Sequence, residues 1–410
     1  MKIILPQLPA GPRVRQLLLS MAPTVLPLAT GSVMHLLMAH SIAPADYAII
    51  PQALAIASFA TVIAYFINHD VAAREVAVSP VRTEAVRAFF VGRAAMTLAG
   101  LLIGAGVAHV LHREGYLTIL VFLLWFTVST GLVENLIQSW RANDGFGKSA
   151  LLAVIQFLLL SAGIVFLYFL GATPRSLAMV LTAASFLAAI LALPMAGALF
   201  GRFDRRLMVK MLARSLPVAA SGLAVFVSNW FGVFWLSFAG GGEDLTYYFL
   251  AGKFAGAHLI AISVLYFAFI PELSEMDKKR VRGIFRRWLW VIAAFALASF
   301  LAVYYVVLPA IGAFWGSSYM EVRHYYALYL PWVIIACLSY YCGIFVFASG
   351  YPAIIGVFQA LLALLTVGLT MIAYEKWGPL SLPMAEGVAV LLAGMVQFYL
   401  WNLMVSRFDK

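Results

Sequence analysis

Residues 245–271 combine an apolar run of membrane-spanning length with one formal charge, Lys253. A lysine inside a membrane span costs about 2.5–3.5 kcal/mol on insertion scales, so its ammonium group usually faces protein or water. Gly252 and Gly256 lie beside it as a GxxxG pair, the pattern that lets a neighbouring helix approach closely. Two positions stay open for the charge: the interior of a helix bundle, or the membrane surface near Asp244, which the side chain can reach by snorkelling.

A second group of polar residues recurs at spacings of three and four within and just after the apolar segment 116–139. An α-helix would place this group on one stripe. Its acidic member, Glu134, has two possible roles. The first is functional: the carboxylate binds a proton or cation, or it pairs with an arginine in a cavity. The second is structural: it forms an ion pair with Arg141 or with a loop arginine. The stripe consists of Thr127, Thr130, Glu134, Gln138 and Arg141.

Two more ionisable residues belong to the first two apolar segments. His35 lies within 16–38, and Asp70 is the second residue after 47–68. A histidine in a membrane segment is either a packing residue that finds a hydrogen bond or part of a proton relay. His35 and Asp70 are therefore, with Glu134, candidate coupling residues, that is, residues whose binding of a proton or cation could be linked to the protein's activity.

The composition explains what must position these groups. The chain has 410 residues, of which 64% are hydrophobic and 11% charged, whereas soluble proteins have about 25% charged residues. Apolar runs of about 20 residues predict membrane helices rather than the alternating segments of about 10 residues found in β-barrels. We expect an all-α integral membrane protein with twelve spans near 16–38, 47–68, 88–110, 116–139, 147–170, 174–200, 213–238, 246–271, 287–311, 325–348, 352–374 and 380–403.

The distribution of Lys and Arg predicts the orientation of these spans. Of the 27 basic residues, 22 fall at one side, four at the other, and Lys253 lies inside a span. Basic residues accumulate on the cytoplasmic side, so both termini are expected in the cytoplasm. The net charge of +10 is therefore a signal of topology, and no nucleic-acid partner is expected.

The basic segment 201–214 divides the chain into two sets of six spans. We expect an N-terminal lobe over 1–200, a cytoplasmic linker over 201–214 and a C-terminal lobe over 215–410. Both halves begin in the same orientation, which permits a parallel repeat. An offset of 201 residues aligns Tyr47 with Tyr248 and Gln52 with Lys253, although two apolar segments can also align in this way by chance.

Several motifs of enzymes are missing. The sequence has no Gly-x-x-x-x-Gly-Lys-Ser/Thr loop, no His/Cys spacing typical of a metal site, and no nucleophile–base pair outside the spans. Cys337 and Cys342 lie five apart on one expected helix and point in different directions, so no disulfide is expected. We therefore expect no catalytic residues, no metal and no cofactor.

Five short motifs occur in order along the chain. They are Pro-Ala-Asp-Tyr at 44–47, Arg-Glu-Val-Ala at 74–77, Tyr-Phe-Leu-Ala-Gly-Lys at 248–253 with Pro-Glu-Leu-Ser at 271–274, and Phe-Trp-Gly-Ser-Ser-Tyr at 314–319. In order and spacing they resemble the polysaccharide flippases, the O-antigen (Wzx-type) transporters of the multidrug/oligosaccharidyl-lipid/polysaccharide (MOP) exporter superfamily. The chain departs from the pattern at Ala48, where the family usually has glycine.

This resemblance implies a MATE-like fold of two six-helix lobes in the bacterial inner membrane. It also implies alternating access, with polyprenyl-diphosphate-linked oligosaccharide as the substrate. The expected binding residues for the diphosphate are Lys253, then Arg74 and Arg93 at the cytoplasmic mouth, with Gln52 at the position that the repeat pairs with Lys253. Membrane lipids, a polysaccharide polymerase and the chain-length machinery are the expected partners.

Three alternative functions would each require different sequence features. A multidrug cation antiporter of the same superfamily would have an acidic residue deep in 16–38 or 213–238, and neither segment contains one. A peptidoglycan lipid flippase would have fourteen spans and basic residues in the first span. A scaffold of a polysaccharide-assembly complex, without transport, would need neither Lys253 nor the Glu134 stripe.

Overall fold

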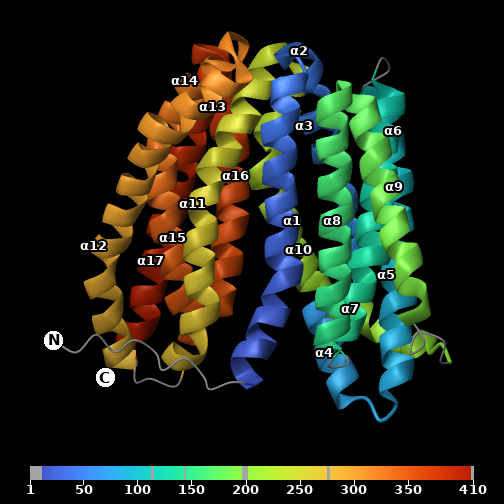
Figure 1. The fold of residues 1–410 in the computed structure, drawn as a ribbon. Helices are drawn as coiled ribbons and strands as arrows, with labels where there is room; N and C mark the ends of the chain where they lie inside the picture. The colour runs from blue at the N-terminus through green and yellow to red at the C-terminus, as the bar shows by residue number, and fades with distance from the viewer. Residues whose placement is uncertain (1–11, 112–114, 143–144, 196–201, 275–277, 408–410) are drawn as a thin grey trace. The chain divides into compact units, whose positions relative to one another are not determined.

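The computed structural model describes residues 12–111, 115–142, 145–195, 202–274 and 278–407, apart from some side chains within helices. These residues are helical almost throughout, as the long apolar runs predict (Figure 1). Ten helical runs in this part of the chain are long and apolar enough to cross a membrane. The protein is thus an all-α integral membrane protein.

The sequence predicts twelve spans, whereas ten helical runs among the described residues are long and apolar enough to be spans. Ten of the predicted segments coincide with the ten membrane-length runs. The other two, 16–38 and 246–271, lie within α1 (Pro12–Ser41) and α11 (Gly242–Ser274), helices of 30 and 33 residues. Both helices exceed the roughly 20 residues that a span needs, and both contain side chains outside the described set.

The chain forms two compact units. The first consists of residues 1–42 and 56–220, and the second of residues 43–55 and 221–410. The short segment 43–55 therefore groups with the C-terminal half of the sequence. The predicted linker 201–214 includes the start of a long helix, α10, which begins at Arg205 and continues to Phe238.

In the first unit, α1 packs along α8, and α9 packs against both α6 and α8. Two helices are shared between the units, because α3 changes unit after residue 55 and α10 after residue 220. The remaining elements are α3 (Ile49–Ala64), α4 (His69–Val78), α5 (Arg82–Leu111), α6 (Tyr116–Val128), η1 (Ser129–Glu134), α7 (Asn135–Ala142), α8 (Phe146–Leu170), α9 (Pro174–Ala192) and η2 (Leu193–Met195).

In the second unit, α11 packs against α14 and α15, and α17 packs against α15 and α16. The short helix α2 also packs on α11, where the Thr246 hydroxyl donates a 2.7 Å hydrogen bond to the Pro44 carbonyl. The remaining elements are α2 (Pro44–Tyr47), α12 (Lys278–Ala302), η4 (Val303–Val307), α13 (Leu308–Trp315), η5 (Ser317–Tyr319), α14 (Glu321–Leu328), α15 (Leu330–Ala348), α16 (Pro352–Trp377), η6 (Pro379–Ser381) and α17 (Leu382–Arg407).

Close helix contacts in the first unit depend on small residues. At Gly100 of α5, an added Cβ would lie 2.4 Å from the backbone carbonyl oxygen of Ala60 in α3. At Gly163 of α8, it would lie 2.4 Å from a methyl group of Val180 in α9. Such small residues allow membrane helices to pack backbone against backbone.

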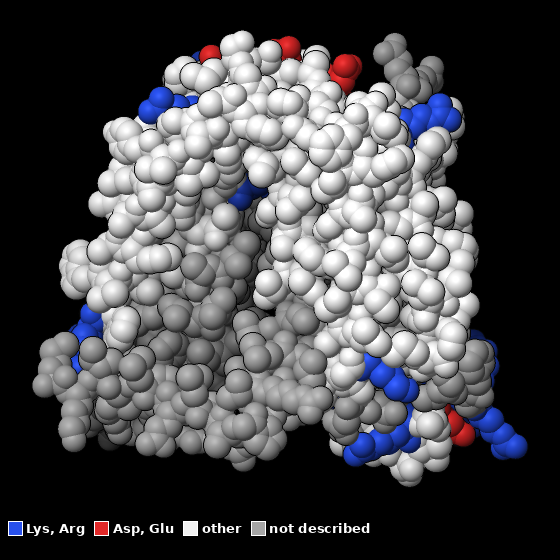
Figure 2. All heavy atoms as spheres, viewed as in Figure 1, with Lys and Arg blue, Asp and Glu red and all other residues white. Residues whose placement is uncertain are grey.

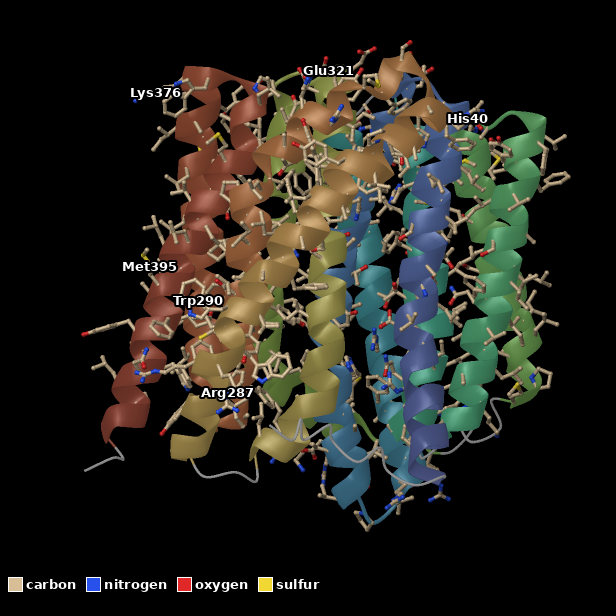
Figure 3. The ribbon with its side chains drawn as sticks, turned by 60° about the vertical axis from the view of Figure 1, so that its left-hand side comes forward. His40, Arg287, Trp290, Glu321, Lys376 and Met395 are labelled. Atoms are coloured by element: carbon tan, nitrogen blue, oxygen red, sulfur yellow. The ribbon has the colours of Figure 1, made fainter. Side chains whose placement is uncertain are left out.

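Charged and apolar side chains are segregated along the helices. On the face shown in Figure 2, the described Lys, Arg, Asp and Glu atoms gather mostly near the helix ends. In the second unit, Glu321 and Lys376 lie at one end and Arg287 toward the other, while Trp290 and Met395 point outward between them (Figure 3). Trp290 is 77% exposed and Met395 58% exposed. An apolar belt of this kind is suited to the hydrocarbon core of a bilayer.

Candidate functional site

A buried ion pair lies inside the first unit. The Arg93 guanidinium of α5 donates a 2.9 Å hydrogen bond from Nη2 to Oε1 of Glu134, the last residue of η1. The Arg93 side chain is 0% exposed and that of Glu134 is 31% exposed. The Tyr65 hydroxyl lies 3.4 Å from the same carboxylate oxygen, and the guanidinium carbon lies 5.1 Å from the Tyr65 ring centre. The arginine charge is therefore balanced within its own unit.

A π-helical turn, η1, presents Glu134 to Arg93. Such turns are rare and frequently occur at functional sites. This turn interrupts the regular α-helical period, so the predicted single stripe from Thr127 to Arg141 does not form as an α-helical stripe. Beyond it, Asn135 Nδ2 donates a 2.8 Å hydrogen bond to the Phe90 carbonyl and thereby ties the next turn to α5. The partner of Glu134 is thus an arginine on a neighbouring helix.

Arg93 lies about three turns inside α5, which is deeper than the predicted cytoplasmic mouth. Two of its nitrogens, Nε and Nη1, are buried without a hydrogen-bond acceptor among the described residues. Arg74, the other predicted mouth residue, is exposed on α4. The structure therefore does not bring the two arginines into one environment.

Lys253 occupies a different setting in the second unit. It lies about 16 Å along α11 from its start at Gly242, and its side chain is exposed. The ammonium nitrogen is 4.7 Å from the ring centre of Phe249 and 5.4 Å from that of Trp230. These two rings stack with centres 6.1 Å apart, and we call them the aromatic shelf. Among the described residues, no carboxylate forms an ion pair with Lys253.

The remaining predicted residues contribute less. Gln52 is half-buried in α3, and none of the described contacts joins it to Lys253. His35 is 9% exposed in α1. Asp70 belongs to α4, but its side chain lies outside the described part of the structure. In the described residues, no group of three or more His, Cys, Asp or Glu could hold a metal ion.

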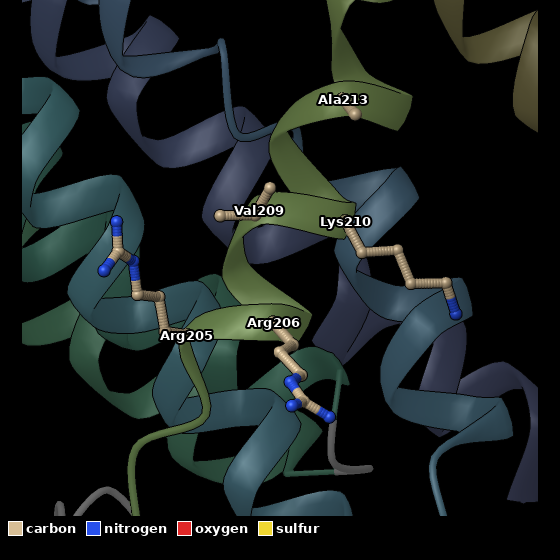
Figure 4. A pocket seen from close by; sticks show the side chains of 5 residues that line it. All are labelled: Arg205, Arg206, Val209, Lys210 and Ala213. Atoms are coloured by element: carbon tan, nitrogen blue, oxygen red, sulfur yellow. The ribbon is translucent and has the colours of Figure 1, made fainter.

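The start of α10 carries a basic depression of about 560 Å³ (Figure 4). Its lining includes three basic residues, and one of them, Lys210, lies 2.6 Å from Oε2 of the buried Glu75. Arg214 also pairs with this carboxylate. The hydrogen bond from Lys210, together with the Arg214 charge, holds the pKa of Glu75 below its usual range, although burial acts in the opposite direction. The lining residues are Arg205, Arg206, Val209, Lys210 and Ala213.

A further ionisable cluster was not predicted from the sequence. Glu386 of α17 is 8% exposed, and the Tyr248 hydroxyl of α11 donates a hydrogen bond to it. The Tyr329 hydroxyl, directly before α15, interacts with the same carboxyl group. A sequence signal existed, because a glutamate inside the predicted span 380–403 is expensive to place in a membrane.

Comparisons with known proteins give structural similarity alone. No protein-family model matches the sequence, and no curated protein sequence matches it. Among solved structures, the chain is similar to an inward-facing multidrug resistance MATE family transporter of the MOP superfamily. The two share 12% sequence identity at a TM-score of 0.73, over 95% of this chain and 98% of that one.

Two further similar structures come from different kinds of transporter. The lipid II flippase MurJ, in an inward closed conformation, has 13% identity and a TM-score of 0.69, over 93% of this chain and 87% of that one. A mutant of the Vibrio cholerae MATE transporter VcmN has 14% identity and a TM-score of 0.62, over 96% of both chains. The protein therefore has the fold shared by MOP superfamily transporters of the MATE and MurJ types.

Proposed function

We propose that this protein is a flippase that moves a polyprenyl-diphosphate-linked oligosaccharide across the bacterial inner membrane by alternating access. The observation that carries the proposal is the state of Lys253. It is an exposed cation within a membrane-length helix, it rests on the aromatic shelf, and no described carboxylate neutralises it. A charge at such a position is costly, so it is expected to serve a substrate or ion pathway.

The chemistry of Lys253 favours an anionic substrate. A lysine binds phosphate as a point charge, and a diphosphate that crosses hydrocarbon needs a compensating cation. A cationic drug would instead be repelled by the ammonium group. The two kinds of transporter found by structural similarity, multidrug and lipid-carrying, do not discriminate between these substrates at 12–14% identity.

The Arg93–Glu134 pair differs from Lys253 in a way that supports Lys253 as the binding residue for the diphosphate. Arg93 is already paired with a carboxylate in its own unit, so it has less charge to offer to a diphosphate. We therefore rank Lys253 above Arg93 and Arg74 as the binding residue. A polysaccharide polymerase and the chain-length machinery remain the proposed partners, because they would act on the translocated product.

The test compares three variants in a strain that lacks the native gene. Lys253→Ala should accumulate the lipid-linked oligosaccharide on the cytoplasmic face and abolish surface polymer, because the cation is lost. Lys253→Arg should retain both, because the charge is kept. A membrane-impermeant glycan reagent measures the sidedness, and immunoblotting confirms equal protein levels.

Lys376→Ala is the matched control. This lysine is also exposed and lies 5.9 Å from a tryptophan ring, Trp377, but it occupies the end of α16. Its replacement should leave polymer unchanged. Equal polymer in Lys253→Ala and Lys253→Arg would contradict the binding role. A normal lipid pool in the deletion strain, combined with greater sensitivity to toxic cations, would instead favour the multidrug alternative.

A further inference from the structure

In the second unit, the described groups that hold one buried carboxyl group are hydroxyls. Glu386 is 8% exposed, and Tyr248 and Tyr329 are each 3% exposed. The rings of the two tyrosines are tilted, with centres 6.2 Å apart. Tyr248 donates to the Glu386 carboxylate from α11, and Tyr329 approaches it from the residue before α15. Three segments that are distant in sequence thus meet at one carboxyl group.

Two glycines leave room for these hydroxyls. A Cβ added at Gly232 of α10 would lie 2.1 Å from the Tyr248 hydroxyl oxygen. A Cβ added at Gly252 of α11 would lie 3.2 Å from that of Tyr329. Larger residues would displace the tyrosines from the carboxyl group, so backbone spacing helps to build the site. This also assigns Gly252 of the GxxxG pair a packing partner, whereas a Cβ added at Gly256 would have no described atom within 4 Å.

No cation balances this carboxyl group among the described side chains. The groups that act on it are Tyr248 of α11 and Tyr329, the residue before α15, and no charged group among the described residues of α10, α14 or α16 does so. The nearby lysine on α11, Lys253, directs its ammonium group to the aromatic shelf instead. An ionised carboxylate buried without a cation is strongly disfavoured. Binding of a proton removes that charge.

We propose that Glu386, with Tyr248 and Tyr329, is a proton-binding site whose occupancy is coupled to transport. Proton uptake converts the carboxylate to a carboxylic acid, whose O–H then donates to a tyrosine oxygen. This inference rests on the proposed transport function and deepens it by naming the coupling ion and its site.

The coupling follows from shared helices. Residues 221–238 of α10 provide both Gly232, which makes room for Tyr248, and Trp230 of the aromatic shelf. The helix α11 provides Tyr248 and Gly252 at the carboxyl group, and Phe249 and Lys253 at the shelf. The neutral carboxyl group favours the packed arrangement, while the ionised one favours separation of α11 from α17 and entry of water. A change in that packing moves the helix that carries Lys253.

The first experiment measures proton binding without transport. Infrared difference spectra of the purified protein, recorded as the pH is lowered, should show the C=O band of a protonated carboxyl group that Glu386→Gln removes. Tyr329→Phe should shift the pH at which the band appears. Glu375→Gln, which replaces an exposed glutamate of α16, should leave the band unchanged.

Two spectroscopic outcomes overturn the site. One is an identical pH-dependent band in the wild type and Glu386→Gln, because the titrating group would then lie elsewhere. The other is a band that does not respond to pH but changes on addition of sodium ions, which would assign a sodium site. Because Glu386→Gln can alter folding, Tyr329→Phe provides the independent measurement.

The second experiment measures coupling in proteoliposomes with a fluorescent polyprenyl-diphosphate glycan. An imposed proton gradient should accelerate movement of the lipid by the wild type severalfold and have no effect on Glu386→Gln. Equal acceleration of both proteins overturns the coupling role. Absence of movement in the wild type contradicts the proposed flippase function, while the infrared result still decides whether Glu386 binds a proton.

Discussion

The two units differ in how they accommodate the charged residues within their helices. In the first unit, Arg93 and Glu134 meet at 2.9 Å and neutralise one another. In the second, Lys253 lies on aromatic rings, and Glu386 is held by tyrosine hydroxyls. Each unit therefore has a cation and an acid in its helices, but only in the first do these two form a described pair. A neutralised pair stabilises structure, whereas a separated cation and acid remain available for ligands and protons.

The largest expected effect comes from breaking the pair in the first unit. Glu134→Ala leaves Arg93, which is 0% exposed, as an uncompensated charge. The unfolding free energy should fall by about 3 kcal/mol, the lower end of the range for a broken buried pair, because Glu134 is itself 31% exposed. Thermal denaturation of the purified protein measures the loss.

The double variant Arg93→Met with Glu134→Ala is the control for this prediction. It removes the uncompensated charge, so it should recover part of the lost stability. A double variant that is less stable than Glu134→Ala alone would show that packing, not charge balance, dominates at this pair.

A second comparison concerns helix packing. Gly100→Ala in the first unit would place a methyl group 2.4 Å from a backbone oxygen of α3, which cannot rotate away. We expect a loss of roughly 2–3 kcal/mol. Gly106→Ala on the same helix has no atom within 4 Å of the added carbon and should be neutral. Equal melting temperatures for the two variants would contradict the close contact between α3 and α5.

A smaller effect is expected from Glu75 and depends on pH. Its pKa is lowered in the folded protein, so its ionised form stabilises the fold above the pH at which an ordinary glutamate titrates. That stabilisation is lost as the pH falls below the range in which an ordinary glutamate titrates and through the lowered folded-state pKa. The wild type should lose roughly 1–2 kcal/mol over this range.

Glu75→Gln supplies the control, since it has no charge to titrate there. Its melting temperature should depend less on pH than that of the wild type across the same acidic range. Parallel pH profiles of the two proteins would show that Lys210 and Arg214 do not stabilise the fold through this carboxylate.

The smallest expected effect on stability belongs to Lys253. Lys253→Met removes cation–π contacts worth about 0.5–1 kcal/mol at exposed sites, and it also removes the cost of a charge within a span. The two effects oppose each other, so Lys253→Met should not lower the stability by more than about 1 kcal/mol. Arg93→Met, measured in parallel, should be clearly less stable. Equal losses in the two variants would assign Lys253 a structural role.

Of the two sites proposed in the second unit, the sequence pointed to the lysine of the diphosphate site and to little of the proton site. Lys253 was recognisable because one charge in an apolar run of membrane length is conspicuous. Glu386 is equally unusual within its span, but its partner Tyr248 lies 138 residues away, and tyrosines near span ends are commonly interfacial residues. No local period links these positions, so their contact could not be predicted from the sequence.

Glu134 shows the same limit at shorter range. Its acidity and position marked it as a candidate, with Arg141 or a loop arginine as one possible partner. The π-helical turn at 129–134 changes the direction of the side chain relative to a regular α-helix, and α5 supplies Arg93 from 41 positions away. Sequence spacing alone does not predict such a turn.

The sequence by itself determined that this is a helical membrane protein, because the hydrocarbon core requires every span to satisfy its backbone hydrogen bonds within one long apolar helix. It also determined which spans carry charges. Only the tertiary structure decided which charges are neutralised and which remain separate. That distinction depends on the contacts between helices, since a membrane offers little water to screen a charge and the nearest side chain decides its energy.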